Sequence, residues 1–184
     1  MVEISLHILD IVQNSIKAGA TLVEICVREY VENNLLSVTI KDNGCGMDKE
    51  FLKDVTSPFR TTRTTRKVGL GISMFKSAAE LTGGNFEIDS ELGKGTVLTA
   101  NFVYDSIDRQ PVGDMASTMV TIIQGAPDID YVYTHLYGDN QLDFDTRQIR
   151  SALGDDIKLS EPDVLSWMED YIKNETENIY GGAV

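Results

Sequence analysis

Glycines at the ends of regular elements are the feature that most constrains this chain. DNGCGM, residues 42–47, directly follows an alternating run that predicts a strand, and GLGI, residues 69–72, opens a predicted helix. Glycine loses more backbone freedom on folding than any other residue, so its repeated use at two such junctions favours a close approach of the backbone to another group. DNG also predicts an ordinary turn, and the neighbouring sequence has to decide between the two interpretations.

The first half of the chain reads as alternating helical and strand patterns. Apolar spacings of three and four residues predict helices, and strict alternation predicts strands. Residues 57–68, SPFRTTRTTRKV, are polar and irregular. The predicted elements are a helix at 2–18, strands at 21–29 and 35–41, a short helix at about 49–56 capped by Asp48, a helix at about 70–82, and strands at 85–90 and 95–104.

The pattern changes after Asp105, which divides the chain into an expected domain at 1–104, a linker at 105–114 and an α+β region at 115–184. The β-branched residues at 115–123 predict a strand-rich run. The other elements expected in this region are strands near 129–137 and 140–144, a helix near 146–153, and an amphipathic helix that starts at Pro162.

Charge is unevenly distributed between these two halves. Residues 1–104 carry 11 basic and 13 acidic side chains (−2), and residues 105–184 carry 5 and 16 (−11), which together make the net charge of −13. An acidic surface repels phosphate backbones, so we expect no nucleic-acid partner. The acidic region is instead expected to be a docking surface for a basic protein or a fixed part of an assembly, unless it serves only solubility.

Hydropathy and cysteine content indicate a cytoplasmic protein without a membrane partner. No apolar run approaches the roughly 20 residues that span a bilayer. The N-terminus, MVEISLHILD, has acidic residues where a secretory signal needs basic ones. Cys26 and Cys45 show no metal-ligand spacing, so free thiols are expected.

Asp10 and Asn14 form a candidate pair on the first predicted helix. Four residues apart, they share one face and lie one turn from each other. The amide oxygen of Asn14 suits Mg²⁺, which prefers oxygen ligands and keeps several waters. Asp10 is placed to act as a general base. Two polar residues on a solvated helix face are the simpler alternative.

Asp42 ends a predicted strand at the first glycine motif. Its carboxylate can accept a hydrogen bond from an exocyclic amine such as that of adenine, and Gly44 and Gly46 would let the backbone approach the flat base. Further along, GKGT at 93–96 predicts a hairpin turn, with Thr96 on the emerging strand placed to bond the base or an ordered water. A plain turn remains the alternative at both places.

A basic stretch precedes the second glycine motif. Arg60, Arg63, Arg66 and Lys67 fall within eight residues, with threonines such as Thr61 between them. The N-terminus of a helix presents unpaired N–H groups and a positive dipole end to phosphates. This stretch is therefore expected to close over an anion as a lid, and a solvated loop is the alternative.

Taken in order, the four motifs resemble the ATP-binding domain of the GHKL superfamily, which includes gyrase, a heat-shock chaperone, histidine kinases and the MutL mismatch-repair proteins. DIVQNSIKAGAT resembles the MutL-type N-box, whereas SPFRTTRTTRKVGLGI and DSELGKGTVLTANF are more similar to a histidine kinase catalytic domain. The resemblance covers about residues 1–104. It implies an α+β fold, a two-layer α/β sandwich in which helices cover one face of a mixed sheet.

The resemblance also implies ATP and Mg²⁺ as cofactors and gives roles to single residues. Asn14 would be the magnesium ligand, Asp10 the general base and Asp42 the acceptor of the adenine amine. The other candidate nucleotide contacts are Gly44, Gly46, Arg60, Thr61, Lys67, Gly69, Leu70, Gly71 and Thr96.

Two departures from the superfamily pattern bear on the reaction. The superfamily's ATPases usually carry glutamate at the base position, and the shorter Asp10 retracts the carboxylate by about a bond length, which weakens activation of water. Histidine kinases usually show GTGLG, whereas Lys67 and Val68 precede GLG here, which adds a charge able to reach a γ-phosphate.

Three functions follow as hypotheses. The chain begins almost at the N-box with no phosphoacceptor histidine segment ahead of it, which favours a stand-alone protein kinase acting on a partner in trans, similar to the anti-sigma-factor serine kinases. An ATPase that switches partner or homodimer state with nucleotide is the second hypothesis. A nucleotide-sensing module without chemistry is the third. His7, on the stripe of Asp10 and Asn14, could orient Asp10.

Overall fold

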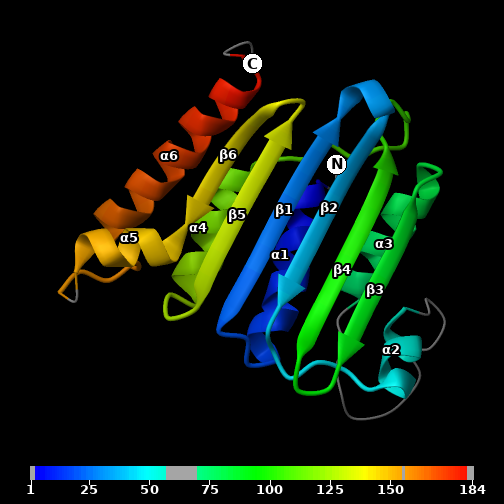
Figure 1. Cartoon of the computed structure of the whole chain (residues 1–184), viewed down its shortest axis with the longest axis horizontal. Coiled ribbons are helices and arrows are strands. Elements are labelled where there is room, and N and C mark those ends of the chain that lie inside the picture. Colours follow the sequence, from blue (N-terminus) through cyan, green and yellow to red (C-terminus); the bar gives the residue numbers. More distant parts are fainter. Residues whose placement is uncertain (1–2, 57–69, 155, 182–184) are drawn as a thin grey trace.

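The computed structural model describes residues 3–56, 70–154 and 156–181, which form a layer of helices against one six-stranded sheet (Figure 1). The strand order is β3-β4-β2-β1-β5-β6, and every neighbouring pair is antiparallel except β1 and β5, which are parallel. The strands are β1 (Leu22–Tyr30), β2 (Leu35–Asp42), β3 (Asn85–Glu91), β4 (Gly95–Val103), β5 (Asp130–Tyr137) and β6 (Asn140–Asp145).

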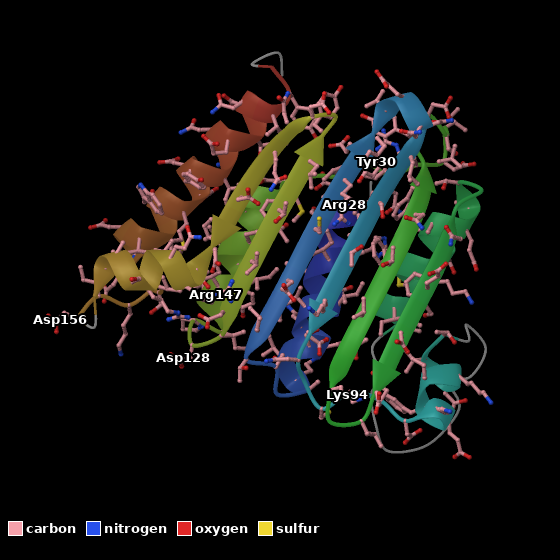
Figure 2. All side chains as sticks on the ribbon, in the orientation of Figure 1. Arg28, Tyr30, Lys94, Asp128, Arg147 and Asp156 are labelled. Atoms are coloured by element: carbon pink, nitrogen blue, oxygen red, sulfur yellow. The ribbon has the colours of Figure 1, made fainter. Side chains whose placement is uncertain are left out.

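Helices cover one face of this sheet, as the predicted two-layer arrangement requires (Figure 1). The α-helices are α1 (Ile4–Lys17), α2 (Lys49–Val55), α3 (Gly71–Leu81), α4 (Met115–Gly125), α5 (Thr146–Leu153) and α6 (Pro162–Ile179), and the 3₁₀-helix η1 (Val31–Asn33) joins β1 to β2. The alternation of β1 turns Val23, Ile25 and Val27 toward the buried helical layer. The side chains that alternate with these, such as Arg28, lie on the opposite face of the sheet (Figure 2). The predicted α+β sandwich is confirmed.

The strands of the acidic region continue the sheet of the first half rather than forming a sheet of their own. β5 lies parallel to β1, with Leu22 opposite Asp130 and Glu29 opposite Tyr137. β6 then pairs with β5 as the edge strand. The two regions seen in the sequence therefore share one sheet and one hydrophobic core.

The prediction of a strand-rich run at 115–123 was wrong, because these residues form helix α4. Buried side chains recur at helical spacing, at Met115, Met119, Ile122 and Ile123. Asp114 caps the helix by accepting a hydrogen bond from the Ser117 backbone N–H at 2.9 Å. Burial of this apolar stripe against the sheet outweighs the weak strand preference of the β-branched residues.

The segment 105–114, expected to be a linker, packs against the start of α1. The carbonyls of Pro111 and Val112 accept hydrogen bonds from the backbone N–H groups of Ile4 and Ser5, at 3.0 and 2.8 Å. These are N–H groups that a helix leaves without an internal partner, so the segment acts as the cap of α1.

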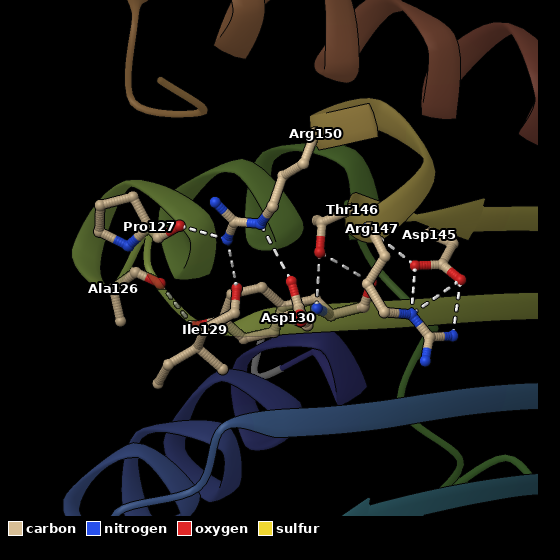
Figure 3. A network of polar contacts seen from close by, with 9 residues as sticks. Ala126, Pro127, Ile129, Asp130, Asp145, Thr146, Arg147 and Arg150 are labelled. Carbon is tan, nitrogen blue, oxygen red and sulfur yellow. Dashed lines mark hydrogen bonds and ion pairs between the residues drawn. The ribbon is translucent and has the colours of Figure 1, made fainter. Parts of the chain in front are cut away.

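Helix α5 is fastened to the start of β5 by a polar network (Figure 3). The Arg150 guanidinium donates to Asp130 at 3.0 Å and to the backbone carbonyls of Pro127 and Ile129. Thr146, fully buried at the first turn of α5, accepts a hydrogen bond from the Tyr131 N–H at 2.8 Å. These bonds hold α5 rigidly against the sheet.

Candidate functional site

A cleft of about 510 Å³ lies where α1, α2 and the start of α3 meet the ends of β2 and β4. Polar groups at one side of it come from α1 and the end of β2, and apolar side chains form much of the remaining wall. The lining residues are Ile11, Asn14, Ser15, Lys17, Ala18, Ile40, Asp42, Cys45, Gly46, Met47, Asp48, Phe51, Val55, Ile72, Leu92, Thr96 and Leu98. A cleft with apolar walls and a few convergent polar groups is typical of a small-molecule site.

Asp42 is held in place at the wall of the cleft by two hydrogen bonds. The Ser15 hydroxyl donates to Oδ2 at 2.6 Å, and the Gly44 backbone N–H donates to Oδ1 at 2.9 Å. An ionised carboxylate is an acceptor only, with about four lone-pair positions, so each oxygen keeps capacity for a further donor. The cleft therefore offers a pre-positioned acceptor for a ligand that carries an N–H group.

Thr96 stands directly beside Asp42 because the two residues are paired in the register of β2 and β4. Ser90 pairs with Thr96 from the other side, and their hydroxyl oxygens are 2.9 Å apart. Ser90 also accepts a hydrogen bond from the Met47 N–H at 2.9 Å. A row of polar side chains across three strands thus ends at the cleft.

Close backbone contacts make glycine necessary at two positions around Asp42. Gly46 has φ +66°, and a Cβ there would lie 2.0 Å from the Glu91 carbonyl oxygen. Gly95 has φ +110°, and its Cβ would lie 2.0 Å from the Asp42 carbonyl oxygen. Both conformations and both approaches exclude a side chain. Gly95, which the GKGT motif suggested only as a turn residue, is thus packed against the strand end that carries Asp42.

Asn43 joins the loop at 42–46 to the start of β1. Its side-chain oxygen accepts hydrogen bonds from the N–H groups of Thr21 and Leu22, at 2.8 and 2.9 Å. Its amide group donates to the Thr21 hydroxyl at 2.8 Å. The loop that positions Asp42 is consequently fixed to two strands of the sheet.

Asp10 and Gly71 lie in contact where α1 passes the N-terminus of α3. A Cβ built on Gly71 would be 3.0 Å from the Asp10 Cβ, so the two helices approach closely here. The Asp10 side chain is exposed and lies outside the lining of the cleft, whereas Asn14, one turn further along α1, belongs to it. Leu70, at the N-cap position of α3, is 55% exposed and has no side-chain oxygen to cap the helix.

The oxygen donors around the cleft fit a magnesium ion that is bound together with phosphates. Asn14 contributes one amide oxygen, and no group of three or more His, Cys, Asp or Glu within the described ranges could hold a metal alone. Mg²⁺ usually takes one or two protein ligands and completes its shell with waters and substrate phosphates. Asn14 is therefore the residue that would hold it.

His7 does not orient Asp10, as its place on the helix had suggested. The ring is buried, stacks on Phe75 with centroids 5.3 Å apart, and its Nε2 lies 3.0 Å from the Gln110 side-chain oxygen. Burial lowers the pKa of His7, although the Gln110 hydrogen bond and the Asp10 charge oppose the shift. His7 is part of the packing between α1, α3 and the 105–114 segment.

Four predicted nucleotide contacts, Arg60, Thr61, Lys67 and Gly69, lie outside the described residues. Among the others, the structure brings Asn14, Asp42, Gly46 and Thr96 into one cleft, and Gly44 supports Asp42 from behind the loop.

Sequence reasoning missed Ser15, Lys17 and Ser90 in this site. Ser15 directly follows the candidate residue Asn14 on α1, which could have indicated that it lies near the site. Its hydrogen-bond partner Asp42, however, is 27 residues away in the sequence. Ser90 contacts the site only because β3 pairs with β4 at Thr96. Each of these contacts depends on strand pairing or helix packing, which a local pattern does not contain.

Comparison with known families places the whole of this cleft inside one type of domain. Residues 2–105 match the family described as histidine kinase-, DNA gyrase B- and HSP90-like ATPases. This range contains α1, the strands β1 to β4 and all the lining residues of the cleft.

Several of the curated relatives are named as sensor proteins or sensor kinases. A sensor protein of Shewanella frigidimarina is 40% identical over 97 residues, which are 52% of this chain and 15% of that protein. The tetrathionate sensor histidine kinase of Salmonella typhimurium is 33% identical over 113 residues, which are 59% of this chain and 18% of that protein. The chain thus spans less than a fifth of the length of these relatives.

A solved structure has a similar fold. The N-terminal domain of a DNA repair protein superimposes with a TM-score of 0.53 at 14% identity, and the match covers 78% of this chain and 52% of that chain. At this identity the likeness concerns the fold alone. Within the described ranges, no helix has the length and apolar character needed to cross a membrane.

Proposed function

Because the chain belongs to the family of histidine kinase-, DNA gyrase B- and HSP90-like ATPases, we propose that its cleft binds Mg-ATP and that the protein is a regulatory protein kinase acting on a partner in trans. The observation that carries the proposal is Asp42, held by Ser15 and Gly44 at the wall of a cleft whose polar groups include Asn14. Cys26 and Cys45 are free thiols, which agrees with a cytoplasmic site of action.

The base end of the cleft selects adenine in this proposal. The remaining acceptor capacity of the Asp42 carboxylate matches the exocyclic amine of adenine, and Thr96 lies beside it. Guanine presents a carbonyl oxygen at the corresponding place, which would oppose the carboxylate and leave it without a partner. Ile40, Phe51 and Leu98 supply apolar surface for the faces of the ring.

The phosphate end lies toward the start of α3. The first N–H groups of this helix have no internal partner, and the helix begins at Gly71, which has no side chain of its own and lies against Asp10. Asn14 would hold Mg²⁺, which when bound supplies charge neutralisation between the phosphates. Lys17, at the end of α1, adds a positive charge to the lining.

Phosphoryl transfer to a protein then requires an acceptor brought to the open side of the cleft. The relatives named as sensor histidine kinases favour a kinase. Asp10, exposed next to the start of α3, is placed to receive a proton from an attacking hydroxyl or water. This position of Asp10 also favours a second candidate function, an ATPase whose hydrolysis switches its partner or dimer state.

The proposal is tested by binding and by phosphate release. We expect calorimetric titration to show saturable binding of Mg-ATP and at least about tenfold weaker binding of Mg-GTP, because Asp42 accepts from the amine of adenine. Phosphate release from Mg-ATP by the protein alone is expected to be slow. Equal affinity for the two nucleotides, or no binding of either, would contradict the proposal.

Asp10→Asn separates the two candidate functions. The side chain is exposed and nearly isosteric with asparagine, so the fold and Mg-ATP binding should be preserved. Substantial phosphate release by the wild type that disappears in Asp10→Asn would favour the ATPase switch. Bound ATP without release from either protein would favour transfer to a protein acceptor.

A further inference from the structure

A second hollow, of about 520 Å³, lies between β6, α5 and α6, and the proposed nucleotide chemistry does not use it. We call it the α5–α6 groove. Its walls are largely apolar and come from all three elements. The apolar and aromatic residues are Phe144 on β6, Ile149 and Leu153 on α5, and Val164, Trp167 and Tyr171 on α6.

Two aromatic rings form one wall of the groove. Trp167 and Tyr171 stack with centroids 5.5 Å apart, and the Tyr171 hydroxyl donates to the Asp143 carbonyl at 3.1 Å. Trp167 nevertheless remains 53% exposed. A tryptophan that is stacked on one side and open to solvent on the other gives a rigid apolar surface of the kind that anchors protein partners.

The opposite wall is equally fixed. Asp145 caps α5 by accepting from the Arg147 N–H at 2.9 Å, and Arg150 bonds to Asp130 at the start of β5 (Figure 3). Because α5 and α6 are both tied to the sheet, a ligand would not need to order the groove before binding. Such preorganisation lowers the entropy cost of association.

The rim of the groove is acidic. Asp143 and Asp163 are exposed, and no cation of the described residues forms an ion pair with either of them. Asp143 accepts only neutral donors, from Gln141 and Thr134. The third carboxylate of the lining, Asp145, is already paired with Arg147 at 2.7 Å. Two negative charges are thus available at the edge of an apolar surface.

The acidic region has few cations of its own to complement this rim, five against 16 carboxylates. In the acidic region, Arg147, Arg150 and Lys173 are engaged with Asp145, Asp130 and Glu169. The whole chain carries a net charge of −13, so a second copy would meet the groove with repulsion at long range. Charge complementarity therefore points to a basic partner rather than to self-association.

We propose that the α5–α6 groove docks a basic amphipathic segment of the partner protein, with an apolar side chain inserted beside Trp167 and lysine or arginine side chains over Asp143 and Asp163. An amphipathic helix laid into a groove, with anchors at helical spacing, is a common mode of peptide recognition. The inference rests on the proposed function only in that the protein acts through a partner.

Trp167 is the single tryptophan of the chain, so its fluorescence reports on this groove directly. The probe is a synthetic helical peptide of about 15 residues, with leucines at helical spacing, lysines elsewhere and no tryptophan. We expect saturable binding, a blue shift of the Trp167 emission, and weaker affinity as salt is raised beyond about 0.1 M. A peptide with glutamate in place of every lysine should not bind.

Matched double variants locate the interaction. Asp143→Asn with Asp163→Asn should weaken peptide binding about tenfold at low salt, because both rim charges are lost. Asp89→Asn with Asp108→Asn removes the same net charge at exposed positions outside the groove and should leave the affinity within about twofold. All four side chains are exposed, so neither variant should disturb folding.

Three outcomes would overturn the inference. These are binding without a change in Trp167 emission, equal loss of affinity in both double variants, and a concentration-dependent dimer in sedimentation that is abolished by Trp167→Ala, which would assign the groove to a second copy. Peptide binding needs no nucleotide. A protein that binds ATP but not the peptide would refute the groove alone, and the converse would refute only the proposed nucleotide function.

Discussion

The cleft proposed for the nucleotide and the α5–α6 groove have nearly the same volume, about 510 and 520 Å³, yet their polar groups are arranged differently. In the cleft, polar groups are turned inward and held there, as Ser15 and Gly44 hold Asp42. In the groove, aromatic and aliphatic side chains form the interior, and the carboxylates of Asp143 and Asp163, which form no ion pair with a cation of the described residues, stand at the rim.

This difference shows that the placing of polar groups, and not the size of a hollow, indicates what it binds. An acceptor inside a desolvated cleft discriminates between ligands, because a wrong ligand leaves it buried without a partner. Charges on an exposed rim mainly orient and steer a partner, and the apolar interior supplies most of the affinity. A small, specific ligand therefore suits the cleft, and a protein segment suits the groove.

Asp42→Asn is the substitution that we expect to distinguish most clearly between ligand binding in the cleft and in the groove. The asparagine amide would place a donor where the carboxylate accepts, so we expect ATP affinity to fall roughly a hundredfold, about 2–3 kcal/mol. Calorimetric titration with Mg-ATP measures the loss. Binding of the lysine–leucine peptide to the groove should stay unchanged in the same sample, and a parallel loss of peptide affinity would show that the hollows are not independent.

A buried hydrogen-bond network outside both the cleft and the groove tests whether the two unfold together. Glu29 accepts hydrogen bonds from Tyr104 at 3.0 Å, from His135 at 2.8 Å and from Tyr180, which follows α6. Glu29→Gln should lower the free energy of unfolding by about 2 kcal/mol, because a charged acceptor of several buried donors is lost. Urea denaturation followed by circular dichroism measures this change.

The position of Tyr180 predicts which part of the molecule Glu29→Gln destabilises most. Loss of its partner should loosen α6, so Trp167 fluorescence is expected to change at a lower urea concentration than nucleotide binding does. Coincident transitions would show instead that the two hollows unfold as one cooperative unit.

The contribution of Glu29 should also depend on pH. Burial raises the pKa of Glu29, but hydrogen bonds from His135, Tyr180 and Tyr104 outweigh it, so the pKa is lowered from the usual 4.5. A carboxyl with a lowered folded-state pKa stabilises the protein fully above its unfolded-state pKa and loses this effect as the pH falls through the folded-state value. The stability difference between wild type and Glu29→Gln should therefore shrink below about pH 4.5.

The smallest effect is expected for Ser15→Ala. The Ser15 hydroxyl is neutral and holds the Asp42 carboxylate in position. Its loss leaves the carboxylate in the cleft, so ATP affinity should fall only about fivefold, near 1 kcal/mol. Titration with Mg-ATP beside Ser117→Ala, which removes a hydroxyl near the cap of α4, provides the control. An unchanged affinity would mean that Gly44 alone suffices to hold the carboxylate.

Much of the first half of the molecule could be predicted from local pattern. The helix of Asp10 and Asn14, the strands leading to Asp42 and Thr96, and the Asp48 cap all follow from spacing and capping chemistry, which act within a few residues. The motif order also led correctly to the family and its two-layer fold. The strand expected at 115–123 failed because β-branched composition was given more weight than the buried stripe from Met115 to Ile123.

Long-range contacts set what the local pattern could not contain. Ser15 meets Asp42 across 27 residues, Ser90 meets Thr96 through strand pairing, and the α5–α6 groove exists because β5 joins β1 in parallel. The acidic charge of the second half is a property of composition, but the apolar groove inside it is a property of packing. Residue types and spacing thus determined the elements and the chemistry available, whereas burial and register, which depend on residues far apart in the chain, decided which groups face each other.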